Sequence, residues 1–487
     1  MMNTTPATSN RAFITTVADL PTTPTTNKTS SVFVLTLGLT IIIASATNLA
    51  VAQTTIPAAD QKGAPQGRRA VRANDFLNSI GVGTHMSQGA DDPSQVASSV
   101  TYAGIRNIRD DDDPNLDGTF ISLHNQTGVK FVLVSSGPSD ATLANLLQDS
   151  LQLANSGALL ALEGPNEPNN FPVTYQGQTS SMATEPFFFP VANFQRNLYS
   201  QAKSDPVLQN YPVFASSEAG GSEPNNVGLQ FLTIPSGAGT LMPDGTKYAD
   251  FANVHNYVIG NGACGTLADN QAWNAEDPTL NSCWDGLYGE YSVTWNKHFQ
   301  GYPTGQVVTL PRVTTETGWY TEGNGAISEV QQGSLFLDLY LDAYKRGWSY
   351  TFIYYLHDTT SQGFWGLFHT DYTPKPSATY LRNLTAILKD GPSSFRPGQI
   401  NYSIPNEPAT VHDLLIEKNN GTFDLAVWDE LVTGSNQVTV DLGSQYKSAT
   451  LYDPTVGAGA IQRLRNVSSV VLTLTNHPVI IEILPGR

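Results

Sequence analysis

The sequence predicts an α/β protein, a (β/α)8 TIM barrel followed by a C-terminal β-sandwich domain. Three features support this prediction. Eight short apolar runs alternate with helix-like stretches, the fourth and seventh runs lead into glutamates, and the last hundred or so residues hold β-branched runs between Asn, Gly and Pro turns. At 487 residues the chain exceeds a barrel of about 250 residues, which leaves room for a second domain.

The apolar runs are spaced through the middle of the chain. They cover residues 80–84, 104–109, 130–135, 159–164, 212–216, 251–255, 312–316 and 350–355. Eight strands that alternate with helices are what a TIM barrel requires, and in such barrels the functional site lies at the carboxyl ends of the strands. We therefore assign residues 76–390 to the barrel and expect the site where these runs end.

Two glutamates occupy such strand ends. Glu167 follows the fourth run in the segment Leu-Glu-Gly-Pro-Asn-Glu-Pro (162–168), and Glu316 ends the seventh run. A carboxylate beside a buried strand is costly unless chemistry needs it. A pair held about 5–5.5 Å apart is what retaining glycoside hydrolysis requires. The Asn-Glu-Pro tripeptide alone is weak evidence, because it recurs at 406–408, where no barrel strand precedes it.

With these motifs in place, residues 76–390 resemble the clan A retaining glycoside hydrolases, although no single family within the clan can be assigned. The resemblance implies that Glu167 is the acid/base and Glu316 the nucleophile, and Asn166 is placed to hold the sugar 2-hydroxyl. It also implies that Arg109, at the end of the second run, hydrogen-bonds the nucleophile. The alternative for Arg109 is an ion pair with the acidic run 110–113.

Other residues of the expected site come from the remaining strand ends. His255 and Tyr257 match the sixth-strand His-x-Tyr of the clan, whose tyrosine touches the nucleophile. The clan usually has a tryptophan at the end of strand eight, and Trp365, ten residues further on, is expected to replace it. We expect His85, after strand one, to bind sugar, and Trp319 and Trp365 to stack on sugar rings. Packing in the core or in a lid is the alternative for these side chains.

The predicted function is a secreted retaining β-glycoside hydrolase that cleaves a β-linked oligo- or polysaccharide. A non-catalytic carbohydrate-binding barrel and a transglycosylase that uses the same two glutamates are the alternatives. Few lysines or arginines fall in the segments expected at the cleft, so a neutral glycan is favoured over a strongly anionic one. Segment 84–86 lacks the His-x-His of a metal-dependent barrel, and no Gly-rich phosphate motif follows a strand. We expect no metal or cofactor, and a monomer.

Charge and the amino-terminal segment indicate an exported protein. The chain has 25 Lys and Arg against 42 Asp and Glu, a net charge of −17, which argues against nucleic acid or an anionic membrane as partner. Residues 1–52 resemble a signal peptide with a long n-region, ending in Ala50-Val51-Ala52. We expect cleavage before Gln53, a linker at 53–75, a secreted or periplasmic location and no stable membrane association afterwards. The alternative is an uncleaved anchor.

Two further expectations concern covalent and domain structure. Cys264 and Cys283, both after the sixth run, are expected to form a disulfide in an exported protein, with two buried thiols as the alternative. Residues 391–487 are expected to form the β-sandwich. Its strands are predicted at 411–417, 422–428, 437–442, 449–452, 469–474 and 479–484.

Overall fold

The computed structural model describes most of the chain from residue 68 to residue 484. Inside that range it leaves out 136, 182–186, 220–224, 258–297, 300, 308, 324–325, 409 and 432–433. All described residues belong to one compact unit, 63–487. The expected signal peptide and the cysteines 264 and 283 lie outside the described residues. Among the residues that are described, no helix combines the length and hydropathy needed to cross a membrane.

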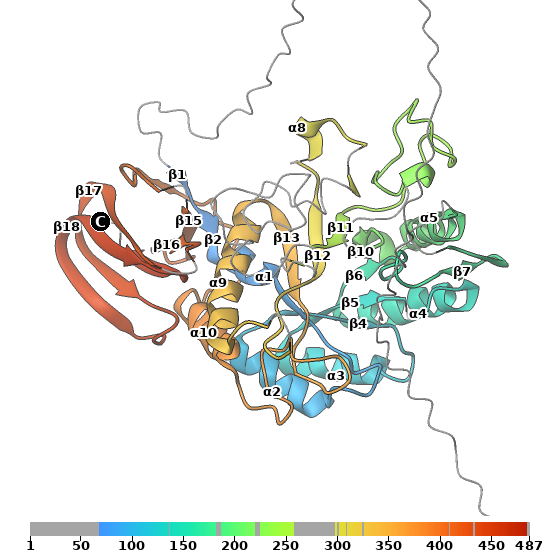
Figure 1. Cartoon of the computed structure of the whole chain (residues 1–487), viewed down its shortest axis with the longest axis horizontal. Coiled ribbons are helices and arrows are strands. Elements are labelled where there is room, and N and C mark those ends of the chain that lie inside the picture. The colour runs from blue at the N-terminus through green and yellow to red at the C-terminus, as the bar shows by residue number, and fades with distance from the viewer. Residues whose placement is uncertain are drawn as a thin grey trace, which may run out of the picture. The chain divides into compact units, whose positions relative to one another are not determined.

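All eight predicted barrel strands are present. They are β3 (Ile80–Gly83), β4 (Asn107–Asp111), β5 (Lys130–Val134), β6 (Leu159–Glu163), β9 (Val213–Phe214), β11 (Ala252–His255), β12 (Arg312–Thr317) and β13 (Trp348–Ile353). With the short β10 (Glu218–Ala219) they form one parallel sheet in the order β10-β11-β12-β13-β3-β4-β5-β6-β9. A parallel bridge between Phe214 and Phe251 also links β9 to the residue before β11, so the sheet curls back on itself (Figure 1).

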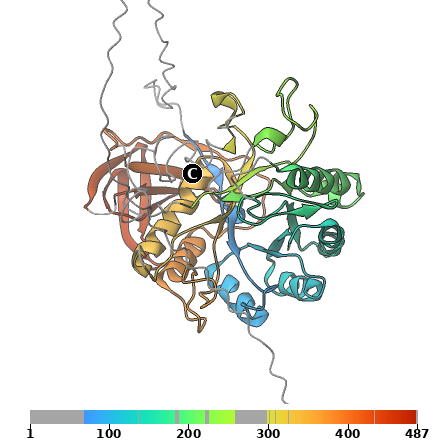
Figure 2. The same ribbon diagram turned by 45° about the vertical axis from the view of Figure 1, so that its right-hand side comes forward.

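Helices follow the strands on the outer side of the sheet (Figure 2). They are α2 (Pro93–Ala103), α3 (Asp117–Thr127), α4 (Asp140–Ser156), α5 (Phe189–Ser204), α8 (Thr304–Val307), α9 (Glu329–Lys345) and α10 (Pro376–Ile387), with α1 (Ala73–Ser79) before the first strand. Local sequence sets their ends. Ser139 and Ser328 form capping boxes at the starts of α4 and α9, and α2 ends at Gly104 in the left-handed conformation.

The carboxyl-terminal region forms a six-stranded sheet, in the order β18-β17-β19-β16-β15-β2. Its strands are β15 (Val411–Glu417), β16 (Phe423–Asp429), β17 (Asn436–Tyr452), β18 (Ala460–Leu474), β19 (Val479–Ile483) and β2 (Val71–Arg72). A two-residue pair, β1 (Arg68–Arg69) with β14 (Gln399–Ile400), accompanies it. Residues 68–72, expected in the linker, therefore belong to the β-structure of this region.

The two runs predicted at 437–442 and 449–452 are one long strand, β17, with an irregular register between Asp441 and Tyr446. Only its second half pairs with β19. Yet Val440 from the first half and Leu451 from the second belong to the same apolar cluster. The β17–β18 hairpin must therefore bend over the rest of the sheet, so that a single sheet supplies both layers around this core.

The other face of this sheet packs on the helix that follows β12. Trp428 of β16 is fully buried in the large apolar cluster of the α/β region, and the ammonium of Lys345 on α9 lies 5.5 Å from the centre of its ring. Ile416 and Ile480 join the same cluster. The carboxyl-terminal sheet therefore shares a core with the α/β region and supports the helix behind β12, the strand that carries Glu316.

Candidate active site

Glu167 and Glu316 meet at the carboxyl ends of the strands. Glu316 lies on β12, and Glu167 lies four residues beyond the end of β6. One carboxylate oxygen of each, together with a ring nitrogen of His255, lie within 4.8 Å of one another. The backbone of Glu167 has φ of 39° and is held there because its amide donates to the carbonyl of Ser217 at 2.7 Å. The short separation between the carboxylate oxygens of Glu167 and Glu316 is of the kind that retaining glycosidases use.

Each oxygen of Glu316 accepts one hydrogen bond. Arg109 Nη1 donates to Oε1 at 2.8 Å, and the Tyr257 hydroxyl donates to Oε2 at 2.8 Å. Burial and then the charge of Glu316 hold the pKa of Tyr257 well above its ordinary value, so its hydroxyl stays protonated and remains a donor. Two fixed donors therefore hold this carboxylate in one orientation.

Arg109 is itself held by a buried carboxylate that the sequence analysis missed. Its Nε and Nη2 donate to the two oxygens of Glu163, at 2.8 and 3.0 Å, and Nη2 also donates to Asn166 Oδ1 at 2.7 Å. Glu163 is fully buried and accepts a further bond from Thr315 Oγ1 at 2.9 Å. The alternative pairing of Arg109 with the acidic run is therefore not found. The sequence did contain a signal for this residue, because Glu163 is a glutamate that ends β6 only four residues before Glu167.

The first aspartate of the acidic run supports the loop after β3 instead. The carboxylate of Asp110 accepts from Thr84 Oγ1 at 2.6 Å and from the amide of Met86 at 2.9 Å. It also accepts from the hydroxyl of Ser87 at 2.7 Å. These bonds hold in place the loop that carries His85 to the cleft.

Glu167 shares a hydrogen bond with His255. His255 Nδ1 lies 2.8 Å from Glu167 Oε1, and its Nε2 lies 3.1 Å from Thr315 Oγ1. Burial works to lower the pKa of His255, but Glu316 and Glu167 outweigh it and raise that pKa. For Glu167, burial works to raise the pKa, but the hydrogen bond and charge of His255 lower it below the ordinary value. This direction is opposite to the raised pKa that a general acid needs near neutral pH. These opposite directions favour the histidine as the place of a proton shared by the pair.

This pairing predicts the alkaline limb of the pH profile. Because the pKa of His255 is raised, the pair keeps its proton above the ordinary histidine value of about 6.5 and loses it as the pH rises further. In His255→Gln, the proton would depend on Glu167 alone, whose pKa burial still raises but only from a carboxylic acid value. The alkaline limb of kcat/KM should move to lower pH. An unchanged limb would show that His255 does not share the donor proton.

A cavity of about 360 Å³ opens in front of the two glutamates. It is lined by Thr84, His85, Gln88, Arg109, Asp110, Asp111, Asn166, Glu167, Phe171, Glu316, Tyr354 and Gln362. His85 lies here as expected, and burial lowers the pKa of its imidazole. Sequence reasoning missed Gln88, Phe171 and Gln362, which come from loops without a motif, and Tyr354, which lies near the end of the eighth predicted run.

The two tryptophans expected at the cleft differ in position. Trp365 is half-buried, and its ring lies 5.2 Å from that of Tyr257 and 6.1 Å from that of Tyr354, so it belongs to the aromatic wall beside Glu316. Trp319 is fully buried and packs against Phe336 of α9, with ring centres 6.0 Å apart. Trp319 therefore offers no ring face to a sugar, and the expectation of stacking is corrected here in favour of core packing.

A buried Ser-His-Asp arrangement lies behind the cleft. Ser99 Oγ is 2.8 Å from His357 Nε2, and His357 Nδ1 is 2.5 Å from Asp91 Oδ1. All three are at least nine-tenths buried, with Ser99 inside α2, so a substrate carbonyl has no access to the hydroxyl. Asp91 Oδ2 instead accepts from the amide of His85 at 2.6 Å. This arrangement fixes α2 and the loop that carries His85.

Glu167, His255 and Glu316 also form the one group of three potential metal ligands found among the described residues. The atoms that would bind a metal ion already take part in hydrogen bonds. Both oxygens of Glu316 accept from Arg109 and Tyr257, and Glu167 accepts from His255 and from Asn170 Nδ2. The guanidinium beside Glu316 supplies the positive charge that an ion would bring. The arrangement fits proton transfer and nucleophilic attack better than metal binding.

No protein-family profile and no curated protein matches the sequence. Solved structures do match. A glucosidase from Croceicoccus marinus is 10% identical, with a TM-score of 0.53, and the match covers 87% of this chain and 98% of that one. A GH51 arabinofuranosidase from Xanthomonas axonopodis pv. citri is 13% identical, with a TM-score of 0.51, covering 86% of this chain and 97% of that one. At these identities the likeness is one of fold, and the chain shares that fold with glycoside hydrolases, as its resemblance to clan A implied.

Proposed function

We propose that the protein is a retaining glycoside hydrolase that cleaves β-linked neutral glycans, on a (β/α)8 barrel with a β-sandwich behind it. The observation that carries this proposal is the close pair of Glu167 and Glu316 in two different environments. Glu316 is fixed by the cationic Arg109 and by a phenol, and Glu167 is joined to a proton-bearing histidine. Paired carboxylates in contrasting environments are how one site provides both a nucleophile and an acid.

In the first step the Glu316 carboxylate attacks the anomeric carbon and forms an ester bond to the sugar. The bond from that carbon to the leaving oxygen breaks, and the oxygen takes the proton held by Glu167 and His255. In the second step Glu167 removes a proton from water, the water oxygen attacks the same carbon, and Glu316 leaves as a carboxylate. Arg109 and Tyr257 stabilise the negative charge as Glu316 departs.

Asn166 is oriented for the sugar 2-hydroxyl. Its Oδ1 accepts from Arg109 Nη2 at 2.7 Å, which leaves Nδ2 without a protein partner among the described residues. Asn166 lines the same cavity as both glutamates. A donor placed there holds the 2-hydroxyl oxygen, and this contact strengthens in an oxocarbenium-like transition state.

The cavity selects against anionic sugars. Arg109 is the one cation in its lining, and its donors are engaged by Glu163, Glu316 and Asn166. Four acidic residues also line the cavity, Asp110, Asp111, Glu167 and Glu316, so a uronate would meet more negative than positive charge.

Neutral hydroxyls have partners along one wall of the cavity. Gln362 accepts from the Tyr354 hydroxyl at 3.1 Å and donates to Gln88 at 3.2 Å, and Gln88 donates to Asp111 at 3.2 Å. This chain of amide and carboxylate groups can both donate to and accept from sugar hydroxyls.

A panel of nitrophenyl β-glycosides tests the proposal. We expect turnover of a β-glucoside, a β-xyloside or a related neutral glycoside, and at least tenfold lower kcat/KM for the matching glucuronide, because a repulsion of about 1.4 kcal/mol corresponds to one factor of ten. Product analysis with natural oligosaccharides should include longer products, since the glycosyl-enzyme can pass its sugar to a second sugar instead of water. Failure to hydrolyse any glycoside would favour a non-catalytic carbohydrate-binding protein, and faster glucuronide turnover would contradict the neutral specificity.

A further inference from the structure

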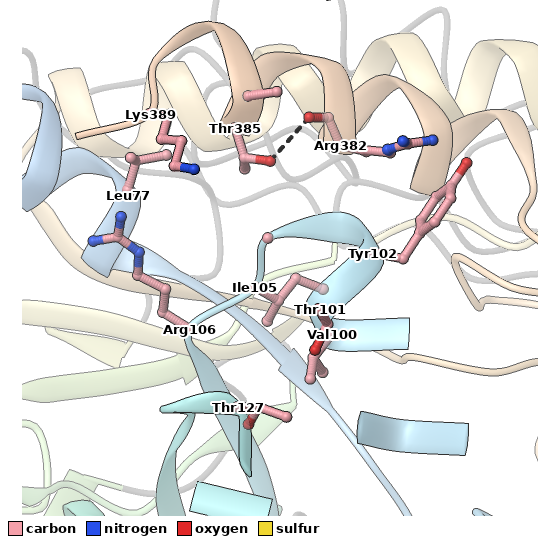
Figure 3. Close-up of a pocket in the computed structure, with 12 residues that line it drawn as sticks. Leu77, Val100, Thr101, Tyr102, Ile105, Arg106, Thr127, Arg382, Thr385 and Lys389 are labelled. Carbon is pink, nitrogen blue, oxygen red and sulfur yellow. Dashed lines mark hydrogen bonds between the residues drawn. The ribbon is translucent and has the colours of Figure 1, made fainter. Parts of the chain in front are cut away.

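A second hollow lies at the opposite end of the strands from the two glutamates. Its volume is about 570 Å³, larger than the cleft. It is lined by Leu77, Val100, Thr101, Tyr102, Gly104, Ile105, Arg106, Thr127, Arg382, Thr385, Ala386 and Lys389. The segment 104–106 comes just before β4, whereas Arg109 to Asp111, at the other end of the same strand, line the cleft. The hollow is therefore formed by the amino-terminal end of β4 and by the ends of α2, α3 and α10 (Figure 3).

The charge of this hollow is opposite to that of the protein as a whole. Three of its lining residues, Arg106, Arg382 and Lys389, are cationic and none is acidic, although the chain carries a net charge of −17. In Figure 3 the end groups of Arg106 and Lys389 lie on one side of the hollow, and that of Arg382 lies on the other side beside Tyr102. Cations thus flank the space from two sides.

None of these cations has a carboxylate partner among the described residues. Arg106 Nη1 donates to Asn74 Oδ1 and Asn78 Oδ1, each at 2.7 Å, and Nη2 donates to the carbonyl of Asp390 at 3.2 Å, all uncharged acceptors. Burial lowers the pKa of Arg106, and the charge of Asp390 only partly opposes this effect. Elsewhere in the chain, buried or half-buried arginines such as Arg109 and Arg346 are paired with acids.

The other two cations are also without an acid. The guanidinium of Arg382 lies 4.6 Å from the centre of the Tyr102 ring, and both Arg382 and Lys389 are exposed. No hydrogen bond of the Arg382 guanidinium is found within the described part of the chain, so its N–H groups remain available to an oxyanion.

The negative carboxyl ends of the nearby helices do not neutralise this positive charge. Three helices end at the hollow, and the carboxyl end of a helix carries roughly half a negative charge that fades within one turn. Their last carbonyls already have partners. The amide of Gly104 donates to Val100, the amide of Gly128 donates to His124, and Thr385 Oγ1 donates to Ala103. The three cations bond to none of these carbonyls. Three helix ends together carry roughly one and a half negative charges against three positive charges, so more than one positive charge is left over.

We propose that this hollow binds a ligand that carries oxyanion groups. These groups are carboxylates, sulfates or phosphates. Arginine offers a planar fork that matches two oxygens of such a group, and lysine offers a point charge. The volume exceeds that needed for one inorganic ion, and the cations on two sides fit a ligand with more than one anionic group. An acidic oligosaccharide and a small free oxyanion share this chemistry. The site does not depend on the proposed glycosidase activity, because its residues are distant from the cleft.

Calorimetric titration of the full protein at low ionic strength tests this proposal with sodium sulfate, inorganic phosphate and trigalacturonic acid as separate probes. We expect one saturable site for at least one probe, weakened by added salt. The double variant Arg382→Gln, Lys389→Gln should bind that probe at least tenfold more weakly. Arg106 is left unchanged, because its bonds to Asn74 and Asn78 support the fold.

A matched control is Lys447→Gln, an exposed lysine on β17 outside the hollow, which should bind as the wild type does. Binding of trigalacturonate alone would identify a sugar acid as the ligand, and binding of sulfate or phosphate alone a small oxyanion. The proposal fails if no probe saturates, or if the double variant binds as tightly as the control. Glycoside turnover by the double variant should equal that of the wild type, so a failure here is separate from any failure of the proposed function.

Discussion

Replacing Glu316 with glutamine should reduce glycoside turnover by at least about 10⁴-fold, because the proposed covalent glycosyl-enzyme forms on the Glu316 carboxylate. The amide cannot attack the anomeric carbon, although it keeps the shape of the side chain and one acceptor for Arg109. The loss should appear for every substrate, including aryl glycosides with good leaving groups. Steady-state kcat on nitrophenyl glycosides measures it.

Glu167→Gln should behave differently from the Glu316 variant. Substrates with poor leaving groups should slow by about 10²–10⁴-fold, the usual contribution of general acid catalysis, while aryl glycosides with good leaving groups keep a rapid first step. Added azide should rescue Glu167→Gln and give a β-glycosyl azide, since the anion attacks the glycosyl-enzyme without a base. In Glu316→Ala, azide should fill the vacated space and give the α-glycosyl azide.

Glu322 supplies the control for both variants. It lies six residues after Glu316 and is exposed, so Glu322→Gln makes the same chemical change outside the site and should leave kcat within about twofold. The opposite pair of azide products would reverse the roles of Glu167 and Glu316. Equal activity in all three variants would show that the site has been placed wrongly.

Glu163→Gln should be the most destabilising of the single changes at the site. Glu163 is fully buried and takes two hydrogen bonds from Arg109, so its neutralisation leaves a buried guanidinium with Glu316 as its one close carboxylate. Breaking a buried ion pair by removal of one partner costs about 3–5 kcal/mol. Urea unfolding of the variant against wild type, with Glu322→Gln alongside, measures this loss.

Glu163→Gln should also have a lower kcat than the wild type. Glu163 does not line the cavity, so KM should change little. It fixes the guanidinium whose Nη1 orients Glu316 and whose Nη2 orients Asn166, so the loss of transition-state stabilisation should appear in kcat. A variant that keeps both its stability and its kcat would show that Arg109 is positioned by other contacts.

The strand pattern could be predicted because it depends on local sequence. Parallel strands that are buried on both faces read as continuous apolar runs, and all eight were found where the runs are. The meeting of Glu167 and Glu316 followed from their places at strand ends, which converge in a parallel barrel whatever the details of the loops. The separation of β17 into two runs was wrong, because a register shift near Asp441 bends a strand without ending it.

The directions in which side chains point were harder to predict from the sequence. Glu163 precedes Glu167 by four residues on the same segment, but its role depends on the neighbouring strands, which bring Arg109 and Thr315 to it from positions 54 and 152 residues away. Trp319 follows Gly318, whose φ of 137° turns the chain so that the indole enters the core beside α9. Neither the inter-strand register nor this turn is written in a local motif.

Proton NMR of the first product released from a β-linked substrate tests the central claim most directly. If Glu316 forms a covalent intermediate that water then opens from the same face, the first sugar product is the β anomer, and the α anomer grows in only later by mutarotation. An α anomer as the initial product would mean a single inverting displacement. It would contradict the role of Glu316 as nucleophile.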